Sequence, residues 1–70
     1  MDTKLLMLDG VGKRYEADIA NAYTTALVYL NSSVGIGEHP QHLDELDKLI
    51  NKISSADENI KTLNKYFTDK

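Results

Sequence analysis

The residues best suited to chemistry in this 70-residue chain lie between positions 38 and 45, and they are Glu38, His39, His42 and Glu45. Imidazole and carboxylate groups bind zinc and serve as general acids or bases. However, the spacing His-Pro-Gln-His is not an established zinc pattern, and a fourth ligand is missing. The competing interpretation is that Glu38 and His39 satisfy the free N–H groups where a helix begins. We therefore expect no metal and no cofactor, and keep metal-responsive regulation through His39 and His42 as the alternative function.

Two glycine-containing fragments resemble parts of phosphate-binding loops, Gly10 to Lys13 and Gly35 to Gly37. Neither fragment follows a buried strand pattern, and neither completes a P-loop or a dinucleotide-binding fingerprint. Serine residues are also present, but none has a His and an Asp partner at a recognisable spacing. We therefore predict that the protein is not an enzyme.

These candidate residues surround a segment that divides the chain into two helical patterns, Val34-Gly35-Ile36-Gly37-Glu38-His39-Pro40. Gly35 suits the left-handed conformation just past a helix, which glycine adopts without a Cβ penalty. Gly37 allows the chain to reverse, and Pro40 has the φ angle of a first helical position. The sequence predicts a turn over 34–39, with Gly35, Gly37 and Pro40 as its defining residues.

Before this turn, apolar or small residues recur in alternating steps of three and four, at Leu5, Leu8, Gly12, Tyr15, Ile19, Ala22, Ala26 and Tyr29. This is heptad spacing, and it continues without a break across Gly10 and Gly12. We predict one helix over about 4–33. The alternative is a helix that begins at Gly10 or later, with Asp9 as its N-cap and Met1 to Leu8 as a separate arm.

After the turn, the same spacing holds at Leu46, Leu49, Ile53, Ala56, Ile60, Leu63 and Phe67. We call these positions and their counterparts before the turn the seam. The pattern predicts a second helix over about 40–68 and an all-α fold, with residues 1–70 forming a single coiled-coil-like antiparallel hairpin. In this hairpin Ala22 and Ala26 would face larger side chains of the second helix, and Gly12 would face Ile60.

Composition limits the size of the core and the choice of partners. Seventy residues make one domain at most, and the chain has no cysteine to staple it. The formal net charge of −3 argues against nucleic acid as a partner. The longest apolar run, Ala26 to Leu30, is far shorter than the roughly 20 residues that span a bilayer. We expect a cytoplasmic protein without a membrane or nucleic-acid partner.

Apolar residues outside the seam exceed what a single hairpin can bury. A monomer would expose them as a patch, which soluble monomers usually avoid. We therefore expect a homodimer that forms a four-helix bundle. The expected interface residues are Tyr15, Ile19, Tyr23, Leu27, Leu30, Leu43 and Ile50. Tyrosine suits such a contact because the ring is buried while the hydroxyl stays hydrated, although these tyrosines also fit an ordinary surface.

Three segments, Lys13 to Ala20, Tyr29 to Asn31 and Val34 to His39, resemble short uncharacterised proteins of marine T4-like bacteriophages. The resemblance covers most of the chain, but it brings no established activity or site residues. It implies a phage-encoded protein in the host cytoplasm or in a virion. Together with the helical pattern, it leads us to expect a small non-catalytic interaction module, either a phage accessory protein that binds a host or phage protein or a minor structural component.

Overall fold

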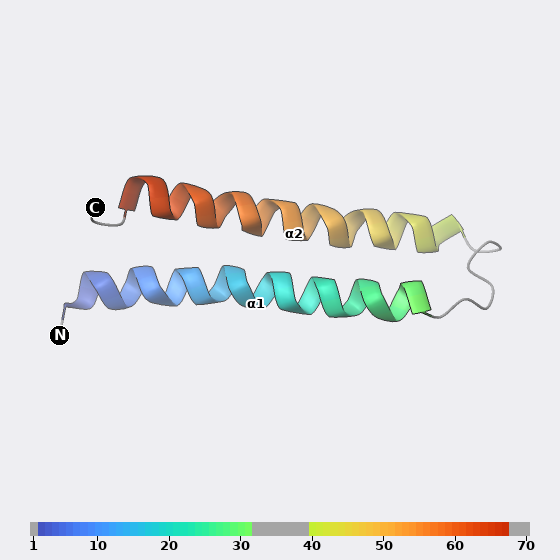
Figure 1. The fold of residues 1–70 in the computed structure, drawn as a ribbon, viewed down its shortest axis with the longest axis horizontal. Helices are drawn as coiled ribbons and strands as arrows, with labels where there is room; N and C mark the ends of the chain where they lie inside the picture. Colours follow the sequence, from blue (N-terminus) through green and yellow to red (C-terminus); the bar gives the residue numbers. More distant parts are fainter. Residues whose placement is uncertain (1, 32–39, 68–70) are drawn as a thin grey trace.

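The computed structural model describes residues 2–31 and 40–67, which form two α-helices lying antiparallel and side by side (Figure 1). Helix α1 spans Thr3–Asn31 and helix α2 spans Pro40–Phe67. The molecule is elongated, with extents of 52 × 19 × 15 Å. The described residues contain no strand, so the predicted all-α helical hairpin is confirmed. Pro40 is the first residue of α2, whereas the predicted turn positions Gly35 and Gly37 lie outside the described residues.

An aspartate directly before helix α1, Asp2, caps the helix. The carboxylate of Asp2 accepts a hydrogen bond of 2.9 Å from the backbone N–H of Lys4, and its carbonyl accepts one of 3.1 Å from the N–H of Leu6. This is N-cap geometry, which satisfies backbone donors that have no partner within the helix. From there α1 continues through Gly10 and Gly12, so the structure has the continuous helix, and Asp9 lies within it.

The centre of the hairpin is built from alanines. Ala22, Ala26 and Ala56 are the buried residues of the described chain, at 2%, 9% and 3% exposure. Small side chains at a helical contact let the two backbones approach closely. Larger seam residues on either side are half-buried, namely Leu8, Tyr15, Ile19, Tyr29, Leu46, Leu49, Ile53, Ile60 and Leu63. The seam residues Leu5 and Phe67 are exposed because they lie at the open end of the hairpin, where no further layer covers them.

Gly12 does not make the close contact with Ile60 that we expected. A Cβ atom at position 12 would lie 3.5 Å from Cδ2 of Leu63, which is an ordinary van der Waals distance. A Cβ atom at Gly10 would have no neighbour within 4 Å. Neither position therefore requires glycine for packing, and both carry the helix-propensity cost of glycine.

Replacing Gly10 with alanine is accordingly expected to stabilise the hairpin by about 1 kcal/mol, because alanine loses less backbone entropy in a helix. For a chain of this size the melting temperature should rise by roughly 4–8 °C, measured by circular dichroism. Gly12→Ala is the matched comparison variant, because it brings the same gain in helix propensity and in addition a contact between the new Cβ and Leu63. A fall in melting temperature for Gly10→Ala would show that the helix does not run through this position in solution.

Candidate interaction surface

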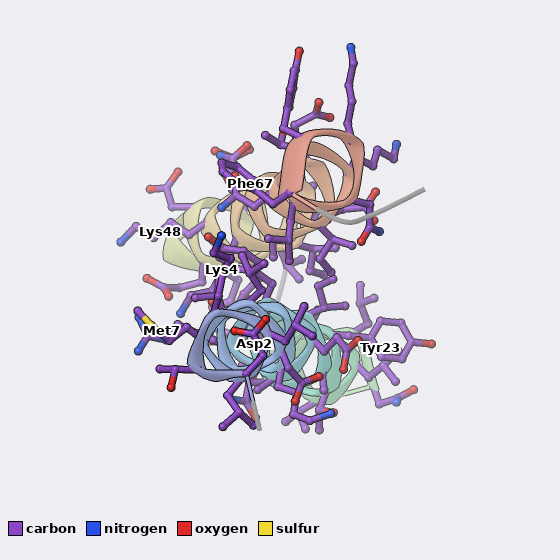
Figure 2. The ribbon with its side chains drawn as sticks, turned by 90° about the vertical axis from the view of Figure 1, so that its left-hand side faces the viewer. Asp2, Lys4, Met7, Tyr23, Lys48 and Phe67 are labelled. Atoms are coloured by element: carbon purple, nitrogen blue, oxygen red, sulfur yellow. The ribbon has the colours of Figure 1, made fainter. Side chains whose placement is uncertain are left out.

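Five large apolar side chains are exposed on one side of the hairpin, in the half next to the turn. Tyr23, Leu27 and Leu30 belong to α1, and Leu43 and Ile50 belong to α2. Their exposures range from 38% for Leu27 to 67% for Leu43. Figure 2 shows the hairpin end-on, with Tyr23 projecting to one side and Met7 and Lys48 to the other. We call these five residues the outer strip.

Heptad geometry explains why the outer strip gathers on one side. Tyr23 and Leu30 each follow a seam residue of α1 directly, and Leu43 and Ile50 occupy the equivalent position on α2. In an antiparallel pair these positions of both helices border the same edge of the seam. Leu27 is four residues after Tyr23 and three before Leu30, so it shares their side of α1. The five residues of the strip therefore share one side of the hairpin, where exposed Asp47 also lies, between Leu43 and Ile50.

Towards the open end the same helical positions become polar. They are occupied by Asp9 and Glu16 on α1 and by Asp57 and Asn64 on α2, all of them exposed. We call the three carboxylates among them, Asp9, Glu16 and Asp57, the charged row. The Nζ atom of Lys13 lies 3.7 Å from a carboxylate oxygen of Asp9, and Nζ of Lys61 lies 3.8 Å from one of Asp57. One face of the hairpin is thus apolar beside the turn and charged beyond it.

The opposite face carries no comparable apolar strip in the described residues. Its exposed apolar side chains are separated along the length of the hairpin: Val28 lies near the turn, and Met7 and Tyr66 lie near the open end. Charged pairs occur there as well, with Nζ of Lys48 located 3.4 Å from a carboxylate oxygen of Glu45. Isolated apolar side chains are normal on a protein surface. The outer strip is the group of exposed apolar side chains that follows one edge of the seam; a second group surrounds the open end and consists of Leu5, Leu6, Met7, Tyr66 and Phe67.

Two residues of the expected dimer interface differ from the other five in their surroundings. Tyr15 and Ile19 are half-buried at the seam between α1 and α2. A side chain that already packs between the helices has less surface to offer a second chain. The structure therefore concentrates the exposed part of the predicted interface in the outer strip.

The expected histidine and carboxylate cluster lies only partly within the described chain. The ring of His42 packs edge-on against the ring of Tyr29, with centroids 5.5 Å apart and planes at 73°. This aromatic contact was not anticipated, although each residue lies two positions from the end of its helix beside the turn. Within residues 2–31 and 40–67 no group of three or more His, Asp or Glu side chains is arranged to hold a metal ion. Glu38 and His39 lie outside these residues.

Two shallow grooves flank the seam at the open end, with volumes of about 340 and 260 Å³. Both are lined by Leu8, Leu63 and Phe67. The larger groove also includes Gly12, whose missing side chain leaves space beside Leu63, and it opens next to the charged row. A glycine at a seam position is the sequence signal that points to this space. Such grooves can accept an apolar side chain.

No family model, curated protein or solved structure matches this chain. Neither described helix combines the length and the apolar character needed to cross a membrane.

Proposed function

We propose that the protein is a non-catalytic helical interaction module that works as a homodimer, with the outer strip as the contact between its two copies. The observation that carries this proposal is the exposure of five large apolar side chains along one edge of the seam, in the half beside the turn. An exposed apolar patch of this kind marks an interaction site more often than a solvated surface. The homodimer would be a four-helix bundle where the hairpins overlap.

The thin core of the hairpin supports self-association. Three alanines are the buried side chains of the described residues, and alanine contributes little apolar area compared with leucine or isoleucine. A chain of this length folded alone buries only about 60% of its unfolded surface. Packing a second hairpin on the outer strip would remove Leu30, Leu43 and Ile50 from water in both copies. Dimerisation would thus provide the core that one hairpin lacks.

The ion pairs beside the charged row need no catalytic explanation. Lys13 and Asp9, like Lys61 and Asp57, are pairs one helical turn apart with side chains that are 59–70% exposed. Exposed pairs of this type contribute well under about 1 kcal/mol and are typical of a solvated helix face. The segment from Lys13 to Ala20 and the two later segments resemble short proteins of marine T4-like bacteriophages. This resemblance is the reason to propose a phage accessory or minor structural role, with a host or phage protein as partner.

The proposal is tested by the mass of the protein in solution. Light scattering at about 100 μM, where a micromolar dimer is saturated, is expected to give twice the chain mass of 7.8 kDa. Circular dichroism on the same sample should show high helicity. A monomeric mass at this concentration with full helicity would overturn the proposal, because the outer strip would then be a stable solvent-exposed surface.

A further inference from the structure

We propose that the two hairpins of the dimer run in opposite directions and overlap only over their turn-proximal halves, with outer strip packed on outer strip. The charged rows then extend away from the contact at opposite ends of the assembly. This inference rests on the proposed dimer and specifies its geometry. It follows from the point at which the exposed face changes from apolar to charged.

The change occurs at matched places on the two helices. On α1 the outer strip ends at Tyr23, and the next equivalent position towards the open end is Glu16. On α2 the strip ends at Ile50, and the next equivalent position is Asp57. Glu16 and Asp57 are both exposed. At these equivalent positions the change therefore occurs at one level on both helices, whereas Leu6, at the heptad position of Leu27, is an exposed apolar side chain in the open half.

A dimer with both turns at the same end and full overlap would press the two charged rows together. Asp9, Glu16 and Asp57 of each copy would enter the interface. The lysines that could neutralise them, Lys13 and Lys61, already pair within the chain, and no ion pair joins Glu16 to another described residue. Removing charges from water is costly unless each is paired with good geometry. This arrangement is therefore unfavourable over half of its length.

A dimer with the turns at opposite ends and full overlap is also unfavourable. It would place part of the charged row of each copy on the outer strip of the other, so that the carboxylate of Asp9 would lie between Tyr23 and Leu27 and that of Asp57 would meet Ile50. Burying an unpaired carboxylate against apolar surface is strongly disfavoured. Sliding the hairpins apart until strip meets strip removes this conflict and keeps every residue of the charged row in water.

The strip-on-strip arrangement is also self-complementary. A two-fold axis near Leu27 places this residue beside its own copy and brings Tyr23 of one hairpin near Leu30 of the other. Such an isologous contact needs one surface patch that matches itself, and the five residues of the outer strip are uncharged, with exposed Asp47 of α2 as their one charged neighbour between Leu43 and Ile50. The charge pattern and the position of the strip therefore favour a second copy of this chain as its occupant.

The three geometries differ in the distance between the two copies of Lys4, an exposed residue at the open end. At 1.5 Å per residue, half overlap separates these positions by about 65 Å, and full overlap with turns at opposite ends by about 40 Å. With both turns at the same end, the two copies of Lys4 are separated only by the width of a four-helix bundle, which is under about 30 Å. Because the chain has no cysteine, Lys4→Cys provides a unique site for a spin label.

Pulsed electron paramagnetic resonance on labelled Lys4→Cys should therefore give a distance near 65 Å, on a sample whose mass is confirmed as dimeric by light scattering. The same label in a Leu27→Glu background is the control and should lose this coupling. A dimer with a distance near 40 Å or under 30 Å would overturn the half-overlap geometry and leave the proposed dimer intact. A monomeric mass with no coupling would overturn both.

Discussion

Leu27→Glu is expected to convert the dimer into a folded hairpin monomer. Leu27 is the least exposed residue of the outer strip, at 38%, and lies between Tyr23 and Leu30 at the proposed two-fold axis. The substitution removes an apolar anchor from each copy and places two carboxylates close together in an apolar contact. Since each 1.4 kcal/mol changes affinity tenfold, we expect the dissociation constant to rise by at least about 100-fold.

The hairpin itself should survive this change, because position 27 lies outside the seam. Sedimentation should show a monomer that retains most of its helicity, and the melting temperature should no longer depend on protein concentration. Ala17→Glu is the matched control, because Ala17 is exposed on the same helix outside both the seam and the outer strip and receives the same charge. If Leu27→Glu remains dimeric with an unchanged melting temperature, the outer strip does not form the contact.

Ala22→Leu is expected to destabilise the hairpin. Ala22 is the most buried residue of the described chain, with 2% exposure, so a leucine there has no space beside α2. Forcing extra methylene groups into a packed contact costs about 1–3 kcal/mol. Each kcal/mol lowers the melting temperature of a chain of this size by roughly 4–8 °C. Thermal melts followed by circular dichroism at one fixed protein concentration measure the loss.

The control for Ala22→Leu is Ala17→Leu, which makes the same chemical change on the exposed side of α1. Alanine and leucine have similar helix propensities, so the control should melt close to the parent protein. Equal melting temperatures for the two variants would contradict the close approach of α1 and α2 at position 22. A loss confined to Ala22→Leu would support the alanine-centred core.

The heptad pattern was sufficient to predict the hairpin and its core. Ala22, Ala26 and Ala56 were assigned to the seam by spacing, and these residues are the ones buried in the described chain. This prediction succeeds because a period of three and four residues fixes which side of a helix a residue occupies, whatever its partner. The same reasoning predicted the exposed apolar surplus, since two helices offer no partner to Tyr23 or Ile50.

Features that depend on which of two candidate residues forms a cap or a contact were harder to predict. Asp2 and Asp9 are both suitable N-caps, and spacing alone does not decide which one the helix uses. Glycine at position 12 suggested a close contact with Ile60, but the nearest atom belongs to Leu63, and there is room for a Cβ. Such outcomes depend on the separation and rotation of the two helices, which a one-dimensional pattern does not specify.

The packing of Tyr29 against His42 also indicates the order in which the parts of the hairpin fold. These two residues are close together along the chain, whereas Gly12 and Leu63, which approach each other at the open end, are separated by most of it. Closing a long loop costs more conformational entropy than closing a short one, and contacts between near residues form faster. Folding should therefore nucleate beside the turn and zip towards the termini, so that the outer strip is complete while the open end is still forming.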